Sequence, residues 1–228
     1  MSFKQQFAQL GNQLQRDRRI EVVRFEMGET AREFDWEVMQ AGTSIEGMAF
    51  PQPAADIILD LNGYHLEWIV KDRVIPPYEA KFREELFGRI WLYDPAELIS
   101  MFDGGEWKET LAHHSGSNNP DETPALIPFD YYHPDYSGCA CFRIQGGRIR
   151  KHITFHSSQL GFYHSSLDIE EYFSLLVASG GLLTAREGLL MSGGLHRSKM
   201  LYYIPLIFPQ SPIKKLVSDF DRKHRKRK

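Results

Sequence analysis

The sequence predicts an α+β fold, with a single mixed, mainly antiparallel sheet flanked by helices and helical extensions at both ends. Two patterns support this prediction: apolar residues alternate at period two in several short segments and recur at helical spacing in others. The strongest of these segments are 60–70, 127–144 and 166–181. Because 42% of the 228 residues are hydrophobic, the chain can bury a sizeable core, and we expect a single domain over 1–228.

The N-terminal half of the chain is expected to alternate helices with strands. Apolar residues at helical spacing from Phe3 to Leu14 predict a first helix, which Ser2 can cap. Asn62 and the glycine after it predict a left-handed end for the helix that precedes the aromatic strand 64–70. The other expected elements are strands at 20–25 and 89–93 and helices at 31–40, 54–61 and 96–102, with Thr30 and Asp94 as caps.

The C-terminal half is expected to contain a surface loop over 103–123, where Gly, Ser, Asn and His are frequent and apolar periodicity is absent. Ser166 is interpreted as the cap of a helix over 167–179. One or two helices are expected after Gly181, the last starting at Ser211. Strands are expected at 125–129, 138–144 and 149–155, the last two joined by a glycine turn.

The formal net charge of −3 hides an asymmetry along the chain. The tail from Arg222 to Lys228 holds six of the 27 Lys and Arg and none of the 30 Asp and Glu, so residues 1–221 carry −9. An acidic body favours basic partners and repels nucleic acid, so nucleic-acid contact is expected only through the tail. The alternative interpretation of the tail is a solvated terminus that aids solubility.

The sequence predicts neither a membrane span nor secretion. No apolar run approaches the roughly 18–20 residues that cross a bilayer. The first residues are too polar for a secretory signal, and Cys139 and Cys141 are the only cysteines. We therefore expect a cytoplasmic protein with no membrane partner.

Four segments follow one another in an order that resembles the SUKH superfamily, which includes the yeast cell-wall-assembly regulator domain and many bacterial toxin-immunity proteins. They are a proline-led helix passing through Asn-Gly into an aromatic strand at 53–68, a strand and capped helix at 90–102, an Ile-Pro strand and glycine turn leading to a further strand at 127–144, and a closing helix at 166–179. The resemblance covers about 30–180, with 181–228 as a helical extension and basic tail. The chain departs from the family in its loop 103–123 and in Tyr136-Ser137-Gly138, where a glycine-aspartate pair is usual.

The resemblance implies a non-enzymatic interaction module, often an immunity protein that blocks a nuclease or another toxin by binding it. The acidic body agrees with a basic toxin domain as the protein partner, because opposite electrostatic fields speed encounter and fix register. The alternative is a regulatory or scaffold protein in which 181–228 docks on a larger assembly.

The predicted partner-binding residues lie mainly in the tyrosine-rich segment that follows the Ile-Pro strand. They are Asp130, Tyr131, Tyr132, Asp135, Tyr136 and, on the aromatic strand, Glu67. Tyrosines interspersed with acids provide contact area at a low cost in entropy. The alternative is that two of the three tyrosines pack inward beneath the loop.

Histidine and cysteine pairs provide the remaining candidates for chemistry. His152 and His156, four apart on one strand, raise a remote alternative, a metal-dependent hydrolase. No HExxH, HxH or CxxC spacing occurs, so we expect no catalytic residue, no metal and no cofactor. Cys139 and Cys141 are two apart and should point to the same side of their strand as small, half-buried residues.

Overall fold

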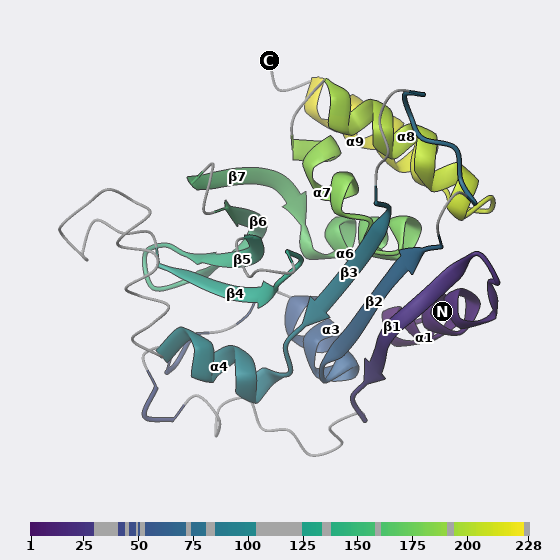
Figure 1. The fold of residues 1–228 in the computed structure, drawn as a ribbon. Helices are drawn as coiled ribbons and strands as arrows, with labels where there is room; N and C mark the ends of the chain where they lie inside the picture. The colour runs from purple at the N-terminus through teal and green to yellow at the C-terminus, as the bar shows by residue number, and fades with distance from the viewer. Residues whose placement is uncertain are drawn as a thin grey trace. The chain divides into compact units, whose positions relative to one another are not determined.

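The computed structural model describes residues 1–29, 41–43, 46–48, 50, 53–71, 74–80, 85–103, 125–133, 138–157, 161–190 and 194–225. Seven antiparallel strands form one open sheet, in which the strands follow their order along the chain (Figure 1). This arrangement confirms the predicted α+β fold with a single, mainly antiparallel sheet. The expected helix at 31–40 and nearly all of the expected loop at 103–123 lie outside the described residues.

The helices and strands have the following bounds. The strands are β1 (Ile20–Met27), β2 (Tyr64–Val70), β3 (Phe87–Leu92), β4 (Leu126–Asp130), β5 (Gly138–Ile144), β6 (Ile149–Ser157) and β7 (Gly161–Asp168). The helices are α1 (Phe3–Arg16), α3 (Ala54–Leu61), α4 (Pro95–Asp103), α6 (Ile169–Ser179), α7 (Leu183–Leu190), α8 (Leu195–Ile207) and α9 (Ile213–Arg225).

The chain divides into two compact units, each assembled from separate stretches of sequence. Unit 1 comprises residues 1–25, 66–90 and 171–228, and unit 2 comprises 26–65 and 91–170. The segment 181–228, expected as an extension, is therefore grouped with the start and the middle of the chain in unit 1.

Unit 1 joins the two ends of the chain. Helix α1 starts with the predicted cap: the Ser2 hydroxyl accepts a hydrogen bond from the Gln5 amide, and the Gln5 side chain accepts one from the Ser2 amide. Phe7 on the buried face of α1 meets Phe173 of α6 edge-on, with ring centroids 5.7 Å apart. The first helix thus packs on a helix more than half the chain away.

Trp68 of β2 connects the strands of unit 1 to its C-terminal segment. Its indole Nε1 donates a 2.6 Å hydrogen bond to the carbonyl of Gly180, and its ring meets Phe208 edge-on at 5.8 Å. Gly88 of β3 leaves room for the indole, because a Cβ there would lie 2.3 Å from the ring. The aromatic face predicted for this strand is confirmed, and its buried Trp68 contacts both Gly180 and Phe208.

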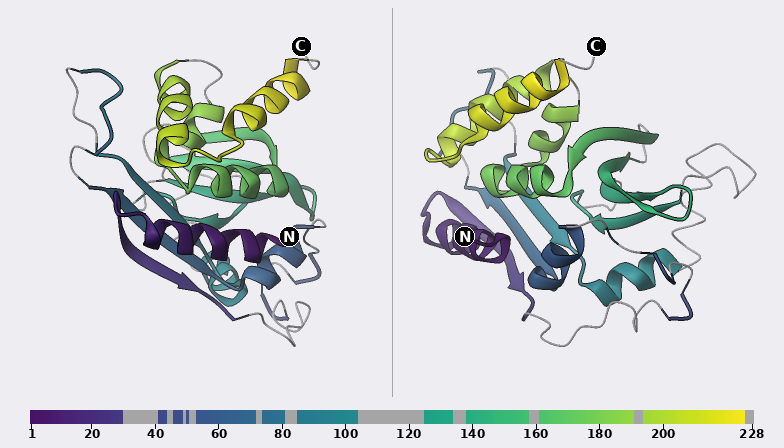
Figure 2. Two further views of the ribbon diagram at one scale, coloured as in Figure 1. Left: turned by 90° about the vertical axis from the view of Figure 1, so that its right-hand side faces the viewer. Right: turned by 180° about the vertical axis from the view of Figure 1, so that it is seen from behind.

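The last three helices of unit 1 lie beyond Gly181, where one or two were expected. Helices α8 and α9 contact each other, as Figure 2 shows in green-yellow and yellow. Arg19 donates hydrogen bonds of 2.9 and 3.0 Å to the carbonyls of Leu206 and Ile207, which end α8 without intrahelical donors. None of the helices in the described part of the chain is long and apolar enough to cross a membrane.

Unit 2 is built around the antiparallel strands β4 to β7. Strands β5 and β6 form the predicted hairpin, and its turn uses the left-handed glycines Gly146 and Gly147, with φ of +60° and +68°. The predicted left-handed residue Asn62 ends α3 with φ of 46°. The predicted Asp94 cap starts α4, accepting a 2.8 Å bond from the Glu97 amide.

The predicted cap at Ser166 is wrong. Residues 161–168 form strand β7, which pairs with β6 through Thr154 opposite His164, and α6 begins only at Ile169. Four of the eight residues of β7 are His, Ser or Asp, so apolar alternation is weak, and pairing with the adjacent strand β6 outweighs the local cap signal. At this junction the Ser165 hydroxyl accepts a 2.8 Å hydrogen bond from the Leu167 amide.

Candidate functional site

The predicted tyrosine-rich contact segment is largely buried where the structure describes it. Tyr131 and Tyr132 are only 5% and 6% exposed, and Asp130 is fully buried. Two of the three tyrosines therefore pack inward, as the alternative interpretation predicts. Asp135 and Tyr136 lie outside the described residues.

Asp130 and Tyr131 tie β3 to β4. The Asp130 carboxylate accepts a 2.9 Å hydrogen bond from the Trp91 amide, and the Tyr131 amide donates to the Trp91 carbonyl at 3.0 Å. The ring of Tyr131 packs against Tyr93 with centroids 5.4 Å apart. These contacts give both residues a structural role in unit 2 and leave them little surface for a partner.

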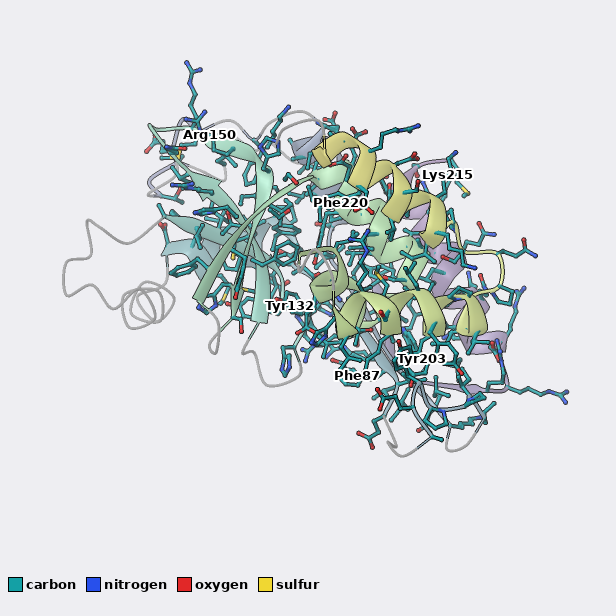
Figure 3. The ribbon with its side chains drawn as sticks, turned by 90° about the horizontal axis from the view of Figure 1, so that it is seen from above. Phe87, Tyr132, Arg150, Tyr203, Lys215 and Phe220 are labelled. Atoms are coloured by element: carbon teal, nitrogen blue, oxygen red, sulfur yellow. The ribbon has the colours of Figure 1, made fainter. Side chains whose placement is uncertain are left out.

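Tyr132, labelled in Figure 3, lies against the start of β5. A Cβ on Gly138 would lie 2.9 Å from the Tyr132 ring, and the ring meets Phe155 edge-on at 6.2 Å. The sixth predicted residue, Glu67, belongs to unit 1, where its carboxylate lies 3.1 Å from the guanidinium of Arg89 and its side chain is 28% exposed. Glu67 therefore keeps some surface for a partner, whereas Tyr132 does not.

The two cysteines share one side of β5, as their spacing predicts. Their sulfur atoms lie 3.5 Å apart, and both residues are fully buried rather than half-buried. They form an apolar cluster with Leu126 and Tyr131. Burial raises the pKa of the Cys139 thiol, and the hydrogen bond with Cys141 and the charge of Asp130 raise it further. The thiol is therefore protonated near neutral pH, the opposite of an activated nucleophile.

Histidines occupy positions on β6 and β7. His156 pairs with Cys139 across the strands and is buried, and its ring lies 5.1 Å from that of Phe162. His164 is hydrogen-bonded to the Thr154 hydroxyl at 3.1 Å, and burial together with the nearby Arg143 charge lowers its pKa. Among the described residues, no three His, Cys, Asp or Glu side chains converge to hold a metal ion.

The property that sequence reasoning missed is how charge divides between the units. Unit 2 contains 19 Asp and Glu and 6 Lys and Arg, a formal charge of −13. Unit 1 contains 11 Asp and Glu and 21 Lys and Arg, a formal charge of +10. The separation of charge is not visible when charged residues are counted along the sequence, because stretches of unit 1 alternate with stretches of unit 2.

The acidic character of unit 2 reaches its surface. Asp56 in the first turn of α3, Glu97 in that of α4 and Glu170 in that of α6 are all exposed. Carboxylates in the first turn are favoured by the positive end of the helix, so these side chains also stabilise their helices. The exposed cations of unit 2 include Arg148 and Arg150 at the β5–β6 turn, the second of which is labelled in Figure 3.

No family model matches the chain, and neither a curated protein nor a solved structure matches it. The fold and the site thus define an α+β protein with an open antiparallel sheet and two oppositely charged units. The SUKH resemblance remains a prediction from the residues.

Proposed function

We propose that the chain is a non-enzymatic protein-binding module of the immunity type, which neutralises a cognate toxin by direct binding. The partner is a basic toxin domain, such as a nuclease, and unit 2 provides the contact surface. The observation that carries this proposal is the formal charge of −13 on unit 2.

Electrostatic complementarity gives unit 2 two advantages as a binding surface. An acidic field raises the rate at which a basic domain encounters it, and this effect weakens with salt because the Debye length falls to about 8 Å at physiological ionic strength. Like-charged proteins are excluded, which adds specificity. The carboxylates of Asp56 and Glu170 are exposed and can meet a partner without first breaking a buried contact.

Contacts inside unit 2 also support its strands. The part-buried hydrogen bond from the Trp91 amide to Asp130 and the packing of Tyr132 against β5 hold the strands in register. A preorganised surface loses less entropy on binding, so more of the interaction energy appears as affinity. The buried tyrosines thus stabilise unit 2 and do not form the proposed contact surface themselves.

The regulatory or scaffold alternative requires that 181–228 be separable from the body. In unit 1 the Arg186 guanidinium donates to the carbonyl of Arg89 on β3, and Phe208 packs against Trp68 of β2. Deleting 181–228 should therefore expose the indole of Trp68 and destabilise unit 1. These contacts favour a structural role for the segment.

The test is co-expression of the chain with the toxin domain encoded beside its gene, scored as survival and as salt-dependent binding. The double variant Asp56→Lys, Glu170→Lys reverses two exposed charges of unit 2. The matched control, Glu21→Lys with Glu85→Lys, makes the same charge change at exposed positions of unit 1. We expect the unit 2 variant to slow association by about tenfold and the control to change it much less. Equal effects of the two variants, or no protection by the native chain, would contradict the proposal.

A further inference from the structure

We propose that unit 1 has a second binding surface, the groove between α8 and α9, and that it holds the phosphate backbone of a nucleic acid without reading its bases. This surface is independent of the proposed contact through unit 2. It would give the chain an anionic ligand in addition to a basic protein partner.

The groove has a volume of about 640 Å³ and is bounded by charged side chains from both helices. Arg197 comes from α8, and Lys214, Ser218 and Arg222 come from α9. Residues four apart share one face of a helix, so the three α9 side chains form a row of two cations with a hydroxyl between them. The row spans about 12 Å at 1.5 Å per residue. One strand of a duplex carries a phosphate about every 3.4 Å, so several phosphates lie along a row of that length.

Two acids on α9 partly neutralise the groove. Asp221 lies 2.5 Å from Arg197, and Asp219 lies 2.7 Å from Arg222. Lys214 is exposed and has no hydrogen-bond or ion-pair partner among the described residues. A phosphate can therefore bind at Lys214 without displacing a carboxylate, while Asp221 limits the affinity at the Arg197 end.

A nucleic acid fits this face better than a membrane does. Much of the apolar side of α9 is already covered: Ile213 and Val217 are 0% and 6% exposed, and Leu216 and Phe220 are half-buried. The helix therefore has little free apolar surface to insert into a bilayer, whereas an interfacial helix requires a whole apolar face. The cations continue beyond the groove through Lys215, labelled in Figure 3, and through the sequence of the tail 222–228. Cations repeated along the sequence match a polymer that carries a charge at every unit.

The first experiment measures the binding of the full chain to a short fluorescent single-stranded RNA and to a DNA duplex, between about 50 and 200 mM salt. The groove variant is Lys214→Gln, Lys215→Gln, Arg222→Gln. The matched control removes three exposed cations from unit 2: Arg148→Gln, Arg150→Gln, Lys151→Gln. We expect the groove variant to weaken binding by at least about tenfold and to lower the salt slope by about one for each lost phosphate contact. The control should bind as the native chain does.

A second variant tests the geometry by strengthening binding. Asp221→Asn removes the carboxylate beside Arg197, so it should tighten nucleic-acid binding by more than Glu85→Gln, which removes an exposed acid of unit 1 outside the groove. A defect in folding cannot mimic a gain in affinity.

Three results would overturn the proposal. One is equal loss of binding in the groove variant and the unit 2 control. Another is native binding by the groove variant together with complete loss in Arg225→Gln, Lys226→Gln, Arg227→Gln, which would assign binding to the tail alone. The third is equal affinity for polyglutamate or for phosphatidylserine vesicles, which would show a general attraction to anions. None of these results bears on the proposed contact of unit 2 with a basic protein.

Discussion

The contacts that stabilise unit 1 internally differ in kind from those that stabilise unit 2. Unit 1 depends on side chains that reach backbone carbonyls far away in sequence, as when Arg19 bonds Ile207 and Arg186 bonds Arg89. Strands β4 to β7 of unit 2 pair with their sequence neighbours, and aromatic rings fill the space between them. Local pairing loses little loop-closure entropy, whereas distant contacts lose more. Unit 1 is therefore expected to be more sensitive to the loss of a single polar side chain.

Arg186 is the position where this difference should be largest. The residue is fully buried, and its guanidinium donates to the Tyr172 hydroxyl at 2.9 Å, the Gly181 carbonyl at 3.0 Å and the Arg89 carbonyl at 2.9 Å. Arg186→Met leaves three buried acceptors without these donors, so we expect a loss of about 2–4 kcal/mol in the free energy of unfolding. Urea denaturation measures this loss. The exposed control Arg148→Met in unit 2 should change stability by less than about 0.5 kcal/mol.

Arg186→Lys separates charge from geometry. Lysine keeps the positive charge but lacks the planar fork that reaches several acceptors at once. Most of the stability lost in the methionine variant should therefore also be lost in the lysine variant. A lysine variant as stable as the native chain would contradict the role given to the three hydrogen bonds.

Gly181 in unit 1 and Gly138 in unit 2 each lie where a Cβ would come too close to a neighbouring residue. Gly181 has φ of +72°, and a Cβ there would lie 2.4 Å from Ile90 and 2.7 Å from the Arg89 carbonyl oxygen. Gly138 in unit 2 would place a Cβ 2.9 Å from the ring of Tyr132, which can shift more easily than a backbone. We expect Gly181→Ala to cost about 2 kcal/mol or more and Gly138→Ala about 1 kcal/mol. Thermal unfolding of both variants checks the order, and the reverse order would contradict this account.

Unit 1 buries the polar side chain of Arg186. Substitutions of Cys139 test whether the core of unit 2 also tolerates a polar group. The thiol lies in an apolar cluster with Cys141, Leu126 and Tyr131. We expect Cys139→Ser to lose about 1 kcal/mol more stability than Cys139→Ala, because a buried hydroxyl must find a partner. Chemical denaturation of the two variants gives the difference. Equal stabilities would show that the cluster offers the hydroxyl an acceptor.

His164 should give the smallest effect. Burial and, secondarily, the charge of Arg143 lower its pKa from the ordinary value of 6.5. The His164 imidazole therefore binds its proton more tightly in the unfolded chain than in the folded chain. The contribution of neutral His164 to stability falls as the pH drops below the pKa of the unfolded chain, and it is fully lost below the pKa of the folded chain. An NMR titration should place the pKa below 6.5, and Arg143→Gln should raise it. A pKa above the ordinary value would contradict the assigned causes.

Local signals in the sequence predicted much of the fold. The caps at Ser2 and Asp94 and the left-handed Asn62 depend on neighbouring residues only, and the structure confirms each of them. Strand β7 was not predicted because its pairing depends on the residues of β6 as well as on its own. Ser166, which lies in this strand, has the local pattern of a helix cap. Each strand of the sheet lies beside the next strand in the sequence. A single sheet could therefore be predicted from the order of the strands without knowledge of distant pairings.

The candidate site was harder to predict than the fold. Tyr131 and Tyr132 carry the composition of an interface, but whether a ring points outward depends on what covers it, and sequence spacing does not encode that. The acceptors of Arg186 lie at residues 89, 172 and 181, so its burial could not be inferred from the helix pattern alone. The division of charge required knowing which stretches form each unit.

The most direct test of the central claim, that the two units are separate surfaces of opposite charge, is a residue-resolved NMR titration of the full chain with a short oligolysine peptide. The account predicts chemical-shift changes at amides of residues 26–65 and 91–170, concentrated near Asp56 and Glu170, and fading as salt is raised. Changes of equal size in 171–228, or changes that do not respond to salt, would contradict it.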